Sequence, residues 1–125
     1  MNTFTTPAFV VYRRYLGAVG SLLAGLSVAL AAYATHAVEG AAQGRMLQAA
    51  VMAFAHGVAL AALTPFAQRP MALISLLVIL AGVFLFCASL LAMVVLGMAA
   101  SVVTPFGGAL VISGWLLYAY DRLRT

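Results

Sequence analysis

The sequence predicts an all-α integral membrane bundle of four transmembrane helices, which run up and down and are joined by short loops. Of the 125 residues, 66% are hydrophobic and 6% are charged, whereas about a quarter of the residues of a soluble domain are charged. The apolar residues form runs long enough to cross a hydrocarbon core about 30 Å thick. The chain has room for four such spans and none for a separate soluble domain, so we expect one domain over 1–125.

The charged residues are six arginines against Glu39 and Asp121, which gives a formal net charge of +4. In a membrane protein such an excess mainly sets the orientation and the contact with anionic lipid, so nucleic acid is not an expected partner. Cys87 is the only cysteine, which excludes a disulfide within the chain. We expect Cys87 to be a small packed side chain.

The first span is expected at about 15–35, after a short cytoplasmic lead over residues 1–15. Arg13 and Arg14 stand between tyrosines just before the apolar run, as is typical of an anchor at a membrane face. A twin-arginine signal peptide with an Ala-x-Ala site at 32–34 is the alternative. The apolar run of about 20 residues is long for such a segment, and the chain downstream is also apolar.

One face of the first span carries small residues at intervals of four, and these are Gly17, Ser21, Gly25 and Ala29. Small residues at this spacing let helix backbones approach closely in lipid. We therefore predict that this face packs against a neighbouring helix. His36 continues the same face, so we expect its side chain to point towards the bundle at the outer rim.

The second span is expected at about 46–64, after a polar connection over 38–45 in which we expect Glu39 and Arg45 to be solvated. His56 lies near its middle, about 15 Å along the helix at 1.5 Å per residue, and shares a face with Gln48. Lipid offers an imidazole no hydrogen-bonding partner. We therefore expect His56 to be uncharged, to face the bundle interior and to bind Ser89, Gln48 or a backbone carbonyl.

The third and fourth spans are expected at about 71–96 and 105–120. No charged residue occurs between Met71 and Tyr120, a distance about right for two crossings. Thr104 and Pro105 are expected to begin the fourth helix, because threonine caps free amides and proline suits the first helical position.

Four spans place five of the six arginines on the side of the two termini and leave Arg45 alone on the other side. The positive-inside rule then predicts a multi-pass protein of the inner (plasma) membrane with both termini in the cytoplasm. Several polar side chains gather towards the outer side in this arrangement. The polar pocket predicted there consists of His36, His56, Gln48, Ser89 and Thr104.

Two short motifs stand out in the third and fourth spans. Residues 86–90 read Phe-Cys-Ala-Ser-Leu, and residues 104–108 read Thr-Pro-Phe-Gly-Gly and are followed by Gly114 and Trp115. They resemble the Phe-Ser-Gly-Ser-Leu, Thr-Pro-x-Gly-Gly and Gly-Trp motifs of a known family, the small four-span membrane proteins of domain of unknown function family 423, which includes the transmembrane protein 256 group.

The resemblance covers about 16–120, and both histidines stand where the family has histidines. The family carries no established reaction, so the resemblance supports the fold and the location and leaves the function open. The residues expected to pack helices together are Gly17, Ser21, Gly25, Gly57, Gly107, Gly108 and Gly114.

Three functional classes compete. The first is a structural or accessory membrane protein, such as a small subunit of a larger complex, whose polar residues lock helices together. The partners expected are the lipid bilayer and either a larger membrane protein complex or further copies of the chain in a homo-oligomer. Interhelical hydrogen bonds of this kind are worth well under about 2 kcal/mol each. The second is a small transporter or proton-linked carrier that uses His36 and His56, because imidazole titrates near neutrality.

The third class is cofactor binding or catalysis. The two histidines are expected to lie more than about 10 Å apart, too far to ligate one haem. Met52 and His56 could offer ligands to copper, but two ligands do not make a site. We find no phosphate loop, no Cys or His metal cluster and no serine with a plausible acid partner. We therefore expect the first class, with no enzymatic activity, cofactor or metal.

Overall fold

The structure is a computed structural model that describes residues 6–99 and 101–124. It contains α1 (Pro7–Ala37), α2 (Gly40–Leu63), α3 (Pro70–Leu96) and α4 (Val103–Leu123), with a short 3-10 helix, η2 (Thr64–Phe66), after α2. Each of the four α-helices is long and apolar enough to cross a membrane. The predicted fold class, an all-α bundle of four membrane-spanning helices, is confirmed.

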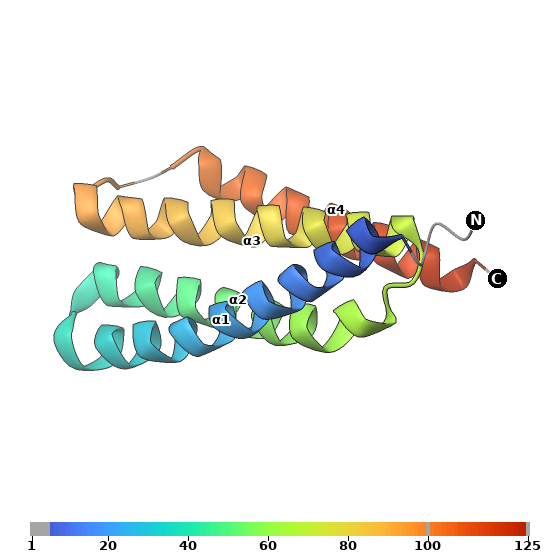
Figure 1. The fold of residues 1–125 in the computed structure, drawn as a ribbon. Helices are drawn as coiled ribbons and strands as arrows, with labels where there is room; N and C mark the ends of the chain where they lie inside the picture. Colours follow the sequence, from blue (N-terminus) through green and yellow to red (C-terminus); the bar gives the residue numbers. More distant parts are fainter. Residues whose placement is uncertain (1–5, 100, 125) are drawn as a thin grey trace.

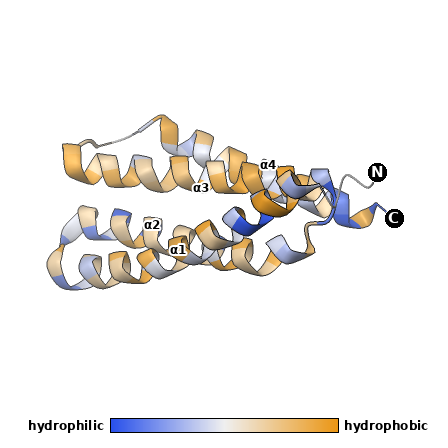
Figure 2. Cartoon of the chain, in the orientation of Figure 1, coloured by the Kyte–Doolittle hydropathy of each residue, from blue (hydrophilic) through white to orange (hydrophobic). Residues whose placement is uncertain are grey.

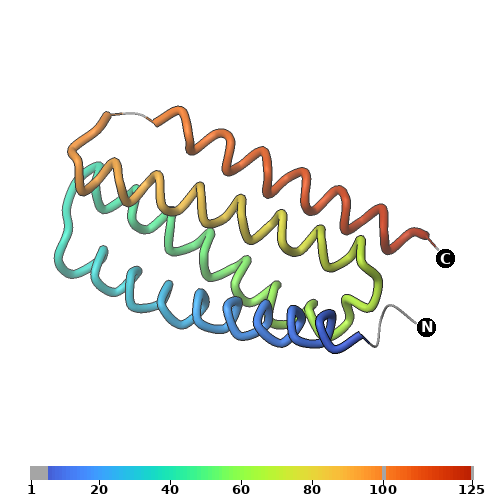
Figure 3. The backbone as a smooth tube through the Cα atoms, turned by 45° about the horizontal axis from the view of Figure 1, so that its top comes forward, coloured from blue at the N-terminus to red at the C-terminus, as the bar shows by residue number. Residues whose placement is uncertain are grey.

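The helices pack as two hairpins. α1 packs along α2, α3 packs along α4, and a smaller contact between α2 and α3 joins the two pairs. The start of α1 and the end of α4 lie at the same end of the molecule (Figure 1). In the tube view, α2 and α3 lie between the two outer helices (Figure 3). This up-and-down order gives the molecule two rims, one at the chain ends and one where α1 ends and α2 begins and where α3 ends and α4 begins.

The first helix is longer than the expected span of 15–35. It begins at Pro7, so Arg13 and Arg14 are part of the helix and not of a lead before it. Proline suits this place because the first helical amides have no partner within the helix. Residues 1–5 of the expected lead lie outside the described part of the chain.

The polar connection expected at 38–45 is also shorter than predicted. α2 begins at Gly40, whose φ of +68° favours glycine, and only Val38 and Glu39 separate it from α1. Gln43 is helical, and its side-chain amide donates to the Ala34 carbonyl at 3.1 Å. The polar side chain of Gln43 therefore caps the end of α1 from within α2, and does not belong to a loop.

The fourth helix also begins before the expected residue. α4 starts at Val103, and the Ser101 hydroxyl accepts the Val103 amide at 3.2 Å. The expected capping role of Thr104 is wrong, because its hydroxyl is engaged with α3. α3 ends at Leu96, followed by Gly97 with a φ of +66°.

The buried core is mostly apolar. Its largest fully buried side chains are Leu60 of α2 and Leu76, Ile79 and Val83 of α3. Ile79 also lies against Gly114 of α4. Large apolar side chains cover the outside as well, and Val95, for example, is 82% exposed. Figure 2 shows hydrophobic residues along the helices and hydrophilic residues gathered towards their ends. Such a surface suits a hydrocarbon solvent, and the chain is a multi-pass membrane protein.

Candidate functional site

The side chain of His56 is half-buried and is bonded within its own helix. Its Nδ1 lies 2.8 Å from the Met52 carbonyl, so in a neutral ring the proton is on Nδ1 and Nε2 keeps its lone pair. The ring lies 6.1 Å from the Trp115 ring of α4, and Trp115 in turn meets Tyr118 edge to face. Of the three expected partners, a backbone carbonyl is the one observed, and the expected bonds to Ser89 and Gln48 are wrong.

The predicted polar pocket is not assembled. His36 and Gln48 are both exposed, and neither meets His56. His36 is exposed because α1 packs with a different face from the one predicted. Its buried residues include Gly20, Ser27 and Ala34 and not the small-residue stripe from Gly17 to Ala29. Each residue turns a helix by about 100°. His36, two residues after Ala34, therefore lies away from the packed face.

Two of the five predicted pocket residues do come together. The hydroxyls of Ser89 on α3 and Thr104 on α4 lie 2.6 Å apart. Ser89 Oγ also lies 2.8 Å from the Phe86 carbonyl. Its single hydrogen is used on that carbonyl, so Thr104 donates to Ser89. The result is a directed hydrogen bond between two spans.

The contact between α1 and α2 is built on two glycines. A Cβ added to Gly57 would lie 2.7 Å from the Gly20 carbonyl oxygen and from the Ala24 amide nitrogen. A Cβ on Gly20 would in turn lie 2.8 Å from the Gly57 carbonyl oxygen and from the Ala61 amide nitrogen. Each helix thus offers a glycine and, four residues on, an alanine. This spacing is the signal by which Gly20, missed in the sequence analysis, could have been found.

The contact between α3 and α4 is also built on glycines. A Cβ on Gly107 would meet the Gly82 carbonyl at 2.9 Å, and one on Gly114 would meet the Ile79 amide nitrogen at 2.9 Å. Gly82 was also missed. Gly108 faces only the edge of the Phe86 ring, at 3.9 Å. The predicted close packing is therefore present at Gly57, Gly107 and Gly114. The packing at Gly108 is loose.

The expected packing roles of Gly17, Ser21 and Gly25 are wrong. A Cβ on Gly17 or Gly25 would meet nothing within 4 Å, and Ser21 is exposed with its hydroxyl on the Gly17 carbonyl. These residues lie one helix position from the packed face.

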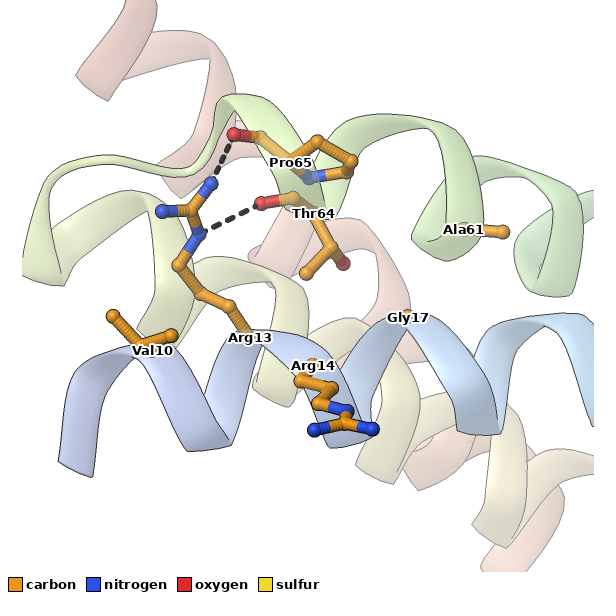
Figure 4. Close-up of a pocket in the computed structure, with 7 residues that line it drawn as sticks. All are labelled: Val10, Arg13, Arg14, Gly17, Ala61, Thr64 and Pro65. Atoms are coloured by element: carbon orange, nitrogen blue, oxygen red, sulfur yellow. Dashed lines mark hydrogen bonds between the residues drawn. The ribbon is translucent and has the colours of Figure 1, made fainter. Parts of the chain in front are cut away.

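The arginines near helix starts form a second set of links that the sequence analysis missed. Arg13 of α1 donates through Nε to the Thr64 carbonyl at 3.3 Å and through Nη2 to the Pro65 carbonyl, at the end of α2 (Figure 4). Arg45 near the start of α2 donates to the carbonyls of Met98 at 3.0 Å and Ala99 at 2.8 Å, just after α3. Arg45 is therefore not simply solvated at the rim.

Arg69, the residue before α3, completes the pattern at the end of α4. Its Nη1 donates to the Arg124 carbonyl at 2.9 Å and its Nη2 to the Asp121 carbonyl. The Asp121 carboxylate, only 3% exposed, pairs with the same guanidinium at 3.3 Å. Carbonyls at a helix end lack partners within the helix and carry the negative end of its dipole. Each arginine thus caps the helix that follows its own.

The described residues offer little to a cofactor. They contain no group of three or more His, Cys, Asp or Glu side chains placed to hold a metal. Cys87 donates its thiol to the Ala49 carbonyl of α2 at 3.3 Å. Within the described ranges every buried side-chain nitrogen and oxygen has a hydrogen-bonding partner. Some polar groups join helices to one another, namely the Ser89–Thr104 pair and the three capping arginines. Others, such as Ser21, Ser75 and His56, bond carbonyls of their own helix.

Comparison with known proteins places the chain in a family. The family model described as "Protein of unknown function (DUF423)" matches residues 30–108, well over half of the chain. The match runs from the later turns of α1 to the start of α4 and includes both histidines and the Ser89–Thr104 bond. The comparisons with curated proteins and with solved structures gave no match. The resemblance seen in the sequence is confirmed, and the chain belongs to the DUF423 family of proteins of unknown function.

Proposed function

We propose that the protein is a structural or accessory component of the inner (plasma) membrane, without enzymatic activity of its own, that acts as a small subunit of a larger membrane complex. The observation that carries the proposal is the use made of the polar side chains. Ser89 and Thr104 join α3 to α4, and three arginines cap the ends of neighbouring helices. A carrier would need such groups free to bind or relay its substrate.

The apolar exterior supports the same role. Large exposed side chains occur on all four helices, including Leu22, Phe54, Phe84 and Leu116. Lipid covers this surface in an isolated chain, and the helices of a partner cover part of it in a complex. The alternative, a proton-linked carrier that uses His36 and His56, receives no support from a shared cavity, because His36 is exposed and His56 bonds its own helix.

The arginines support an orientation with both chain ends in the cytoplasm. Five arginines lie at the helix ends towards the rim of the chain ends, and these are Arg13, Arg14, Arg69, Arg122 and Arg124. Arg45, near the start of α2, stands alone towards the other rim. Two variants test this orientation, Glu39→Cys and Leu123→Cys, each made alone in a Cys87→Ala background. Both positions are exposed. A membrane-impermeant maleimide added to intact cells should label position 39 only. Labelling of position 123 alone would reverse the orientation.

Isolation from native membranes tests the function. A tagged chain at its natural level, extracted in a mild detergent, should migrate on a native gel with other membrane proteins in a stable larger assembly. A tagged four-span protein of another family is the control for carry-over. Recovery of the chain alone, as a monomer or as a homo-oligomer, would contradict the accessory role, and a lone oligomer would favour transport.

A further inference from the structure

A hollow of about 390 Å³ lies between α1 and the end of α2, at the rim of the chain ends. Figure 4 shows its lining, with Val10 and Gly17 on α1 facing Ala61 and Pro65. A Cβ added to Gly17 would meet no neighbouring group within 4 Å. The space beside Gly17 is therefore open, and its floor is apolar.

Two guanidinium groups border this hollow. Arg13 reaches across to the end of α2, where Nε and Nη2 bind carbonyls and Nη1 is left over. Arg14 stays beside α1 (Figure 4), is exposed, and has no hydrogen bond or ion pair to any described residue. Neither acidic residue of the chain neutralises the positive charge of Arg13 and Arg14. Asp121 pairs with Arg69, and Glu39 lies at the other rim.

The hollow lies at the depth of lipid headgroups. Tyr12 and Tyr15, on the same turns of α1 as the arginines, are 62% and 66% exposed. Exposed tyrosines on a membrane helix mark the boundary between hydrocarbon and water. A free cationic group thus stands at the headgroup level above an apolar groove that runs towards the membrane interior.

We propose that this hollow is a binding site for one phospholipid with a net negative headgroup. The phosphate contacts Arg14, whose guanidinium is free, because guanidinium donors match phosphate oxygens in charge and geometry. Arg13, which is turned towards Thr64 and Pro65 (Figure 4), adds positive charge to the hollow. One acyl chain lies along the open face of Gly17 and Ala61. A free anion would use the arginines and leave the apolar floor empty, so the combination fits a lipid.

Native mass spectrometry of the detergent-purified chain, titrated with phosphatidylglycerol or phosphatidylcholine of the same acyl chains, tests the proposal. The wild type should bind phosphatidylglycerol more tightly. Arg14→Gln should weaken that binding about fivefold, the factor that one arginine contributes beside an anionic membrane surface. Gly17→Leu, which fills the groove, should weaken it without changing the charge.

The matched control is Arg122→Gln, which removes an exposed arginine at the same rim outside the hollow. It should leave phosphatidylglycerol binding as in the wild type. Equal losses for Arg14→Gln and Arg122→Gln, or equal binding of the two lipids, would overturn the site. Displacement of the lipid by millimolar inorganic phosphate, with no effect of Gly17→Leu, would overturn it in favour of a free anion site. The titration is made in detergent, so neither orientation nor complex formation affects it.

Discussion

Replacement of Gly57 by alanine should destabilise the contact between α1 and α2. The added Cβ would lie 2.7 Å from both the Gly20 carbonyl oxygen and the Ala24 amide nitrogen, whereas ordinary contacts begin at 3.4 Å. Both atoms belong to the backbone, so no change of rotamer relieves the clash and the helices must move apart. Overpacking of this kind costs about 1–3 kcal/mol in the free energy of unfolding.

Gly25→Ala is the matched control, because it makes the same chemical change on α1 where a Cβ meets nothing within 4 Å. Alanine is favoured over glycine inside a helix by up to about 1 kcal/mol. The two variants should therefore differ in sign, with Gly25→Ala neutral or stabilising.

Unfolding in mixed micelles with increasing sodium dodecyl sulfate, followed by circular dichroism, measures both variants against the wild type. Equal effects, or a larger loss for Gly25→Ala, would refute the packing of Gly57 against Gly20 and Ala24. That result would instead support the stripe of small residues that includes Gly25.

The same unfolding assay tests three further expectations. Ser89→Ala should cost about 0.6–1.7 kcal/mol, from the average to the largest value for interhelical hydrogen bonds in a membrane, and a double-mutant cycle with Thr104→Val should return most of this as coupling. A coupling near zero would contradict the bond. Arg69→Gln should cost about 1–3 kcal/mol, because it leaves a buried carboxylate without its partner. Asp121→Asn should cost less, because the guanidinium that it leaves unpaired is 38% exposed. The opposite order would contradict the pairing. His56→Leu should cost less than about 1 kcal/mol, because its bond lies within one helix; a loss above about 2 kcal/mol would contradict this.

The number of helices could be predicted from the sequence because the membrane sets a minimum length for each apolar run. α3 shows how far this extends. Its span, Pro70–Leu96, differs by one residue from the expected 71–96. Pro70 and Gly97 are local signals that act through the backbone of this segment alone, so they need no knowledge of the neighbouring helices.

The packed face of α1 could not be predicted in the same way. This helix carries two neighbouring stripes with small residues, one through Gly17 and Gly25 and one through Gly20 and Ala24. Both permit close approach of another backbone. The choice between them depends on where Gly57 of α2 lies, which is a relation between two helices and not a property of either.

The contacts of the polar residues were harder to predict than the packed faces. Arg45 was expected in solvent and His36 at a pocket, yet Arg45 caps α3 and His36 is exposed. An arginine side chain is long enough to reach a neighbouring helix end, and its partner is a backbone carbonyl that no sequence pattern marks. The packed face of α1 passes through Gly20, one residue or about 100° from Ser21 on the predicted face. This difference turns His36 away from the predicted pocket.

We propose that the polar side chains hold the fold together and do not carry protons or substrate. Purified protein in liposomes, with an imposed pH gradient and a pH-sensitive dye inside, tests this proposal. The proton flux should be the same for wild type, for His56→Leu and for liposomes without protein. A flux that requires the protein and is abolished by His56→Leu, in a variant that still folds, would contradict it.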